Sequence, residues 1–148
     1  MARHQDSLVS FDVPRDWEDR TVVAYAAPAR DDQRATANIV VTRDRLPEDE
    51  DLEAYVARQA AGLELRLKGF VLDEMGECKV AGRPATRLTF TSNGPGGKLD
   101  QRLYVVALAD RAVASFTMTA PMTEASQCGP LFDRMLASIS LAGTDQGS

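Results

Sequence analysis

Between Phe70 and Thr119, much of the sequence alternates with a period of two residues, and only short breaks interrupt the strand-like segments. This is the spacing of β-strands whose two faces differ. The segments that read as strands are 70–75, 77–80, 85–91, the largely apolar 101–109, and 112–119. The breaks read as turns, namely 81–84, a glycine-rich hairpin loop at 92–97 and the tight turn Asp110-Arg111. No βαβ alternation is present, so we expect an antiparallel sheet rather than a doubly wound parallel one.

Three further strands are predicted before this region. Residues 9–13 alternate and end at Pro14, residues 21–27 are rich in β-branched and aromatic residues, and residues 38–42 read Asn-Ile-Val-Val-Thr. Their links are too short for helical crossovers, which predicts an antiparallel meander. Gly76 interrupts the first of the later strands and is predicted to form a bulge or bend.

Two helices complete the pattern. Between Leu52 and Leu67, apolar residues recur at helical spacing, and Gly69 follows where a left-handed helix end is expected. The acidic run 48–51 precedes this helix, at the end where its positive dipole lies. A second helix is predicted from Pro130, a residue suited to the first helical position, to about Leu141.

These elements predict an α+β fold, in which two helices pack on an antiparallel sheet of about six to seven strands. The chain has 148 residues, 44% of them hydrophobic and 26% charged, which are values of an ordinary globular protein. No repeat or linker divides it. We therefore expect a single domain over residues 1–148, with its ordered part between about Leu8 and Leu141.

Charge and hydropathy exclude several classes of partner. Seventeen basic against 22 acidic residues give a net charge of −5, and no basic run is visible, so nucleic-acid binding is not expected. The longest apolar run, 103–109, is far shorter than the roughly 20 residues of a membrane span. The polar N-terminus lacks a signal-peptide pattern and a lipoprotein cysteine. The sequence therefore predicts a soluble, cytoplasmic protein without stable membrane insertion.

No catalytic, metal-binding or cofactor-binding constellation is visible, so an enzyme is not expected. The only histidine is His4, near the chain end, and the cysteines Cys78 and Cys128 lie fifty positions apart rather than in a close pair. The glycines of 94–97 lack the Lys-Ser/Thr of a phosphate-binding loop. The acids around 48–53 are explained by the helix start rather than by a metal site.

Two amides and several apolar residues stand in unusual positions. Gln59 lies on or near the apolar face of the first helix, and Gln101 opens a long apolar strand. Each amide either bonds within the protein or meets the backbone of a bound peptide. The strands around Val22 and Ile39 are apolar on both faces. One face must meet the helices, and the other is either covered by the chain or exposed to a partner.

The chain resembles the DcrB-related family, whose fold is PsbP-like. The resemblance runs from about Leu8 to Leu141 and is carried by the order and spacing of several short motifs. These motifs are Phe11-Asp12-Val13-Pro14 with Trp17 and Asp19-Arg20-Thr21, 38–43, the helix 52–67, Val80-Ala81-Gly82-Arg83-Pro84-Ala85, and the closing 132–141.

Within this family, the chain looks most like the Eag chaperones of bacterial type VI secretion. The resemblance implies a cytoplasmic homodimer that binds the apolar N-terminal helices of a secreted effector, shields them and aids their loading on the secretion machine. Strand parity and the resemblance together predict the contact residues Val22, Ile39, Val41, Gln59, Gln101 and Leu103. A general PsbP-like interaction or scaffold module, and an enzyme or small-ligand binder, are the alternatives.

Overall fold

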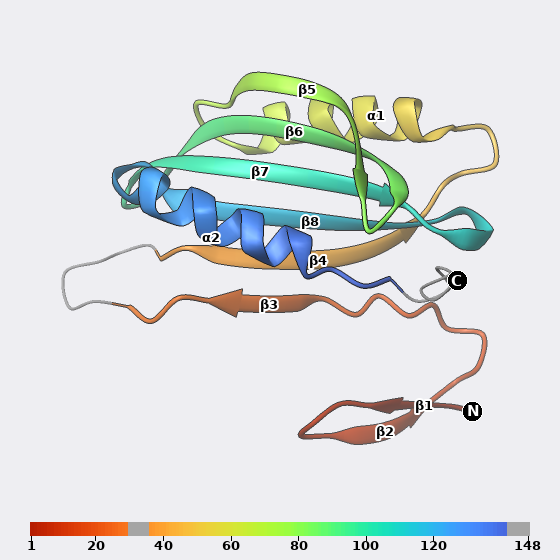
Figure 1. Ribbon diagram of the computed structural model, residues 1–148. Helices are drawn as coiled ribbons and strands as arrows, with labels where there is room; N and C mark the ends of the chain where they lie inside the picture. Colours follow the sequence, from red (N-terminus) through yellow and green to blue (C-terminus); the bar gives the residue numbers. More distant parts are fainter. Residues whose placement is uncertain (30–35, 142–148) are drawn as a thin grey trace.

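The computed structural model describes residues 1–29 and 36–141 and contains one large sheet, one small sheet and two α-helices (Figure 1). The strands and helices in chain order are β1 Ala2–Gln5, β2 Ser10–Val13, β3 Val23–Ala26, β4 Asn38–Arg45, α1 Leu52–Arg66, β5 Val71–Val80, β6 Arg83–Gly94, β7 Gly97–Ala107, β8 Ala112–Pro121 and α2 Ala125–Ala137. Short 3-10 turns, Ala109–Arg111 and Met122–Glu124, flank β8.

The large sheet has six strands in the order β3-β4-β8-β7-β6-β5, and every neighbouring pair is antiparallel. The predicted fold class is thereby confirmed. The predicted three-strand meander is wrong, because β2 pairs with β1 in a separate two-stranded sheet and not with β3. The sequence did not predict the first strand, residues 2–5, which precedes the expected ordered part. At the C-terminal end, residues 142–148 lie outside the described ranges.

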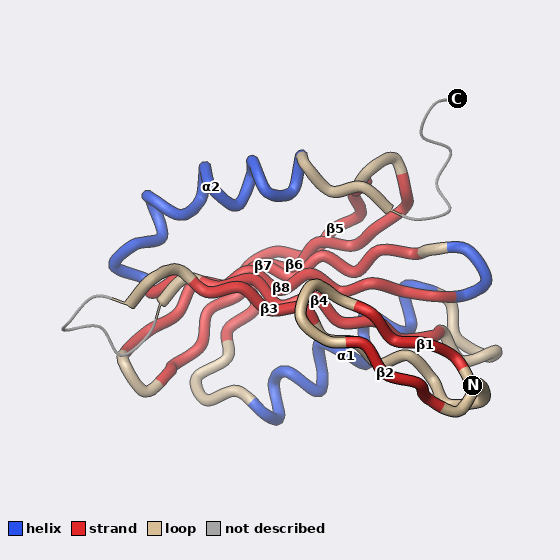
Figure 2. The backbone as a smooth tube through the Cα atoms, turned by 90° about the horizontal axis from the view of Figure 1, so that it is seen from below, coloured by secondary structure: helices blue, strands red, loops and turns tan. Residues whose placement is uncertain are grey.

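Each helix covers its own face of the sheet, and Figure 2 shows the sheet lying between α1 and α2. We call these faces the α1 face and the α2 face. The α1 core joins the buried Tyr55 and Val56 to Leu88, Phe90, Leu103, Val105 and Val113. The α2 core joins Cys128 and Phe132 to residues of the opposite strand parity, among them Tyr104, Val106, Phe116 and Met118. The expectation that both helices meet one face is therefore wrong.

Local interactions fix where α1 begins and ends. The Asp51 carboxylate accepts a hydrogen bond from the Ala54 amide at 2.8 Å, which caps the helix start. Gly69, at a φ of +64°, turns the chain after the helix, and the Asn93 amide then donates to the Lys68 carbonyl at 2.8 Å. These bonds fix the two ends of α1, whose buried side chains pack on β6, β7 and the start of β8.

Two local predictions need correction. Gly76 is not a bulge, because it pairs with Arg87 in regular register, and the irregularity lies between Leu72 and Glu74. The last helix begins at Ala125, before Pro130, because Cys128 and Phe132, four residues apart, are both buried against the α2 face. The preference of proline for the first helical turn therefore does not set the start of this helix, which extends back to include the buried Cys128.

Candidate functional site

α1 covers only part of its face of the sheet. The strand residues that pack against α1 in its core come from β6, β7 and the first residues of β8. Among the described residues, none of these core partners comes from β3 or from residues 38–42 of β4. On the same face, the register leaves Val40, Ser115 and Thr117 half-buried and Ala24 and Ala26 exposed. We call these five residues the open shelf. They are small or β-branched, so another element can approach the backbone closely there.

Gln59 lies on the side of α1 that faces the open shelf. Residues four apart share a helix face, and Tyr55, four before Gln59, donates its hydroxyl proton to the Asp44 carboxylate of β4 at 2.8 Å. Burial and this hydrogen bond raise the pKa of Tyr55, so the phenol stays neutral. The Gln59 side chain is half-buried and has no hydrogen-bond partner among the described residues. Its amide is therefore available to a ligand on the shelf.

Gln101 also faces the α1 side, but it is held within the protein. The Ser92 hydroxyl donates to the Gln101 carbonyl oxygen at 2.6 Å, and the Gln101 amide donates to the Thr119 hydroxyl at 3.1 Å. The register sets Thr119 beside Thr117 at the end of the shelf. Gln101 thus matches the first of the two alternatives predicted for it, an amide that is hydrogen-bonded within the protein at the edge of the core.

The structure does not bring the six predicted contact residues together. Gln59, Gln101 and Leu103 lie on the α1 face, where Leu103 is buried in the α1 core. Ile39 and Val41 pair opposite Met118 and Phe116, so they point to the α2 face and pack against the α2 core. The strand residue that reaches the α1 face between them is Val40.

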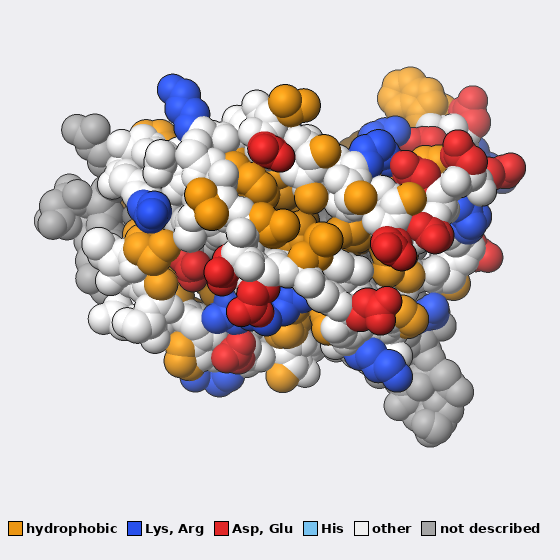
Figure 3. Space-filling model, turned by 90° about the horizontal axis from the view of Figure 1, so that it is seen from above, with side chains coloured by type: hydrophobic (Ala, Val, Ile, Leu, Met, Phe, Trp, Pro, Cys, Tyr) orange, Lys and Arg blue, Asp and Glu red, His pale blue; other side chains and the backbone are white. Residues whose placement is uncertain are grey.

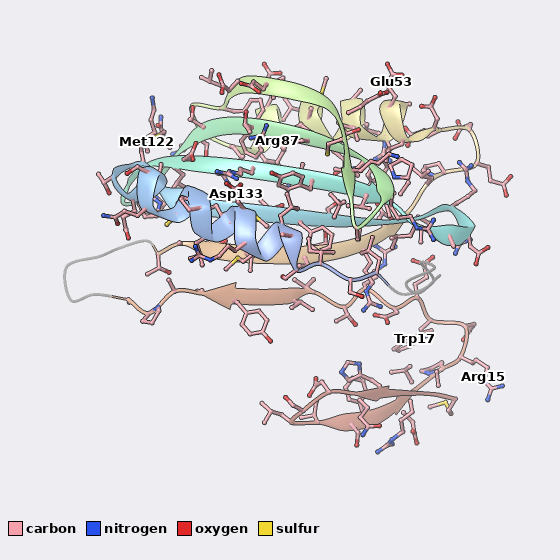
Figure 4. The ribbon with its side chains drawn as sticks, in the orientation of Figure 1. Arg15, Trp17, Glu53, Arg87, Met122 and Asp133 are labelled. Atoms are coloured by element: carbon pink, nitrogen blue, oxygen red, sulfur yellow. The ribbon has the colours of Figure 1, made fainter. Side chains whose placement is uncertain are left out.

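Val22, the sixth predicted residue, belongs to another exposed region at the N-terminal end. It is 59% exposed, directly before β3, and Trp17 and Tyr25 near it are about 70% and 72% exposed. The β1–β2 hairpin stands off the main body here, as Figures 1 and 4 show. A cleft of about 670 Å³ separates the hairpin from β3, and Val22 lines it.

The alternation of side chains between the two faces of a strand explains which residues of the site the sequence did not predict. In residues 38–42, apolar side chains occur on both faces, so alternation alone cannot select Val40 over Ile39 and Val41. Ser115 and Thr117 had a usable signal, because they alternate with the buried apolar residues Phe116 and Met118. Their polarity marks the strand side that no helix covers.

The described residues contain no helix long and apolar enough to cross a membrane. Within the same ranges, no three histidine, cysteine or acidic side chains gather in a way that would hold a metal ion. Burial raises the pKa of both free thiols, Cys78 and Cys128. Neither thiol is therefore activated as a nucleophile by its surroundings.

The three-layer arrangement of helix, antiparallel sheet and helix defines a PsbP-like α+β protein. Solved structures with this fold include the Pseudomonas aeruginosa protein PA94, with a TM-score of 0.78, 24% identity, and coverage of 97% of this chain and 99% of that one. CyanoP from Synechocystis sp. PCC 6803 has a TM-score of 0.52 and 13% identity over 93% of this chain and 89% of its own. LpqN of Mycobacterium tuberculosis, involved in cell envelope biogenesis, has a TM-score of 0.52 and 18% identity, covering 78% and 81%.

The protein belongs to the DcrB family, whose model matches residues 9–138. A curated relative is the protein named Effector EagT6 from Pseudomonas aeruginosa strain PAO1. It is 26% identical over 111 residues, which cover 75% of this chain and 76% of the relative. The predicted resemblance to the DcrB-related family and its PsbP-like fold is thus confirmed.

Proposed function

We propose that this protein is a cytoplasmic chaperone that binds the apolar N-terminal helices of a type VI secretion effector, shields them and aids their loading on the secretion machine. In this proposal it works by binding and not by catalysis, and it needs no cofactor. Membership of the DcrB family and similarity to an Eag-named protein support it. The observation that carries it is the open shelf beside Gln59.

The shelf has the features that a bound helix requires. α1 shows that a helix packs stably on this face of the sheet, and the uncovered strands beside it leave space for another. Small side chains such as Ala24 and Thr117 permit close approach. Burying apolar client surface contributes about 25 cal/mol per Å², less the cost of ordering the complex. The Gln59 amide supplies hydrogen bonds to polar groups that the client buries.

A homodimer is part of the proposal. The edge strand β3, which pairs only with β4 among the described residues, and the detached hairpin expose apolar side chains at one end of the molecule, among them Leu8, Trp17 and Tyr25. Covering this end with a second copy would remove that surface from water. Light scattering measures the mass directly, and a Tyr25→Ser variant is expected to shift the equilibrium toward monomer.

Co-expression tests the chaperone role. The N-terminal segment of an effector encoded beside this gene should be soluble only with the wild-type protein. Thr117→Trp fills the shelf with a large side chain and should abolish solubilisation and co-purification. Thr123→Trp makes the same change at an exposed position in the turn Met122–Glu124 and should leave both intact.

Equal solubility of the segment without the protein would refute the chaperone role. If Thr117→Trp and Thr123→Trp retain the client equally well, the open shelf is not its binding site. A gene neighbourhood without any type VI effector would favour the alternative, a PsbP-like interaction or scaffold module.

A further inference from the structure

The far edge of the large sheet is a long free strand. β5 has ten residues and is the outermost strand, bonded to β6 alone in the described part of the chain. Its irregularity lies at Leu72–Glu74, and Lys79 lies near its other end. Bulges and lysines are devices that protect edges from pairing. Between them, residues 74–78 keep a regular register and present unpaired backbone groups to solvent.

An apolar groove runs beside this edge on the α1 face. It has a volume of about 620 Å³ and lies between Leu52 and Val56 of α1 and Met75, Pro84 and Thr86 of the sheet. Met75 is 54% exposed although its side chain lines the groove. Figure 3 looks down on this side and shows apolar side chains gathered across the middle of the surface. A strand added to β5 would close the open side of the groove.

Two acids and one lysine line the groove. Glu77 and Lys79 come from β5, and α1 adds Glu53, which Figure 4 labels at the same side of the molecule. Glu74 lies 3.9 Å from an arginine of β6, whereas Glu53 and Glu77 have no ion-pair partner among the described residues. A partner that carries lysine or arginine would place opposite charge beside the carboxylates of Glu53 and Glu77.

We propose that the β5 edge accepts an extended segment of another protein as an additional strand. The side chains that the segment directs to the α1 face are an apolar one, which enters the groove beside Met75, and a lysine or arginine, which lies beside Glu53 and Glu77. Backbone hydrogen bonds supply part of the affinity, and the groove and the acids supply selectivity. This site lies on the opposite side of α1 from the open shelf, so one molecule holds a helical client and an extended partner at the same time.

Two synthetic peptides test the proposal. One is an eight-residue peptide in which every second residue is threonine and the residues between them are valine and lysine in turn, so that the valines and lysines share one face of the strand. The other peptide has glutamate in place of each lysine. Binding is measured by fluorescence anisotropy and mapped by amide chemical shifts and hydrogen exchange. The basic peptide should bind, shift and protect the amides of 74–78, and perturb the first half of α1. The acidic peptide should not bind.

Charge-reversal variants locate the contact. Glu77→Lys and Glu53→Lys should each lower the affinity for the basic peptide by roughly five-fold, which is the upper end of the range for exposed ion pairs. Asp16→Lys makes the same charge change at an exposed position near the hairpin and should have no effect. Thr117→Trp, which fills the open shelf, should also leave peptide binding unchanged, and this separates the two sites.

Three results would overturn the proposal. The first is no binding of the basic peptide at millimolar concentration. The second is a set of shifts confined to β3, the hairpin or the α2 face. The third is concentration-dependent protection of the β5 amides without peptide, which would identify a second copy of this chain as the occupant.

Discussion

Replacing Gln101 with leucine is expected to destabilise the fold by an amount that its buried hydrogen bonds set. Gln101 is 8% exposed and links the Ser92 hydroxyl, at 2.6 Å, to the Thr119 hydroxyl, at 3.1 Å. Losing two hydrogen bonds costs about 2 kcal/mol, and leaving the buried Ser92 hydroxyl without its acceptor adds about 1–2 kcal/mol. The leucine side chain recovers about 1 kcal/mol by its own burial. The net loss is about 2–3 kcal/mol.

Urea unfolding followed by far-ultraviolet circular dichroism measures this loss as a lower midpoint at unchanged slope. The matched control is Gln59→Leu, which makes the same change at a half-buried amide without a partner in the described residues. It should alter the free energy of unfolding by less than about 0.5 kcal/mol. In a double-mutant cycle, Ser92→Ala should recover part of the Gln101→Leu loss, because the orphaned hydroxyl is gone.

The reasoning fails if Gln101→Leu is as stable as the wild type, or if Gln59→Leu is equally destabilising. The first result would mean that Ser92, Gln101 and Thr119 do not form the buried chain of hydrogen bonds, and the second would mean that the Gln59 amide has a partner within the protein. Client binding gives a separate readout. Gln59→Leu should weaken binding of the helical client without loss of stability. Any loss of client binding in Gln101→Leu should instead follow from the lower stability of that variant.

Three further predictions follow from the core, a turn and an exposed carboxylate. Phe132→Ala should cost about 3–5 kcal/mol because Phe132 is buried in the α2 core, while Leu131→Ala beside it, where the side chain is 38% exposed, should cost less than about 1 kcal/mol in urea unfolding. Gly69→Ala should cost about 1–2 kcal/mol, measured by thermal unfolding, because its φ of +64° disfavours a Cβ. Hydrogen bonds from Thr21, with the Arg43 guanidinium as a weaker influence, hold the pKa of Asp19 below its usual range, so this stabilisation is complete at neutral pH and is lost as the pH falls below about 4. Carboxyl chemical shifts should show that titration, and Arg43→Ala should move the Asp19 pKa upward.

The sequence predicted the elements with strong periodicity and failed where two signals competed. α1, with its regular apolar stripe and Gly69, was predicted to within one residue at its end. The start of α2 was misplaced because the proline rule is local, whereas Cys128 responds to the sheet beneath it. The strand 2–5 was missed because it is polar and exposed, and its pairing with β2 leaves no apolar alternation to detect.

The candidate site shows the same division. Gln59 was placed on the inner side of α1 from its helical spacing, which requires only local information. The faces of Ile39 and Val41 required knowledge of which strand lies beside β4, and sequence alternation does not contain it. That each face received its own helix was likewise unpredictable, because the strand 101–109 is largely apolar on both sides.

The position of Trp17 has a consequence for spectroscopy. It is the chain's one tryptophan, it is about 70% exposed, and it sits beside the detached hairpin instead of in either core. Its emission therefore reports on the water around the hairpin and is nearly silent about the packing of the sheet. A blue shift on mixing with another molecule would mark the covering of this end, while ultraviolet dichroism follows the sheet. Trp17 fluorescence thus reports on assembly at this end of the molecule, whereas ultraviolet circular dichroism reports on folding, so the two processes can be followed by separate optical signals.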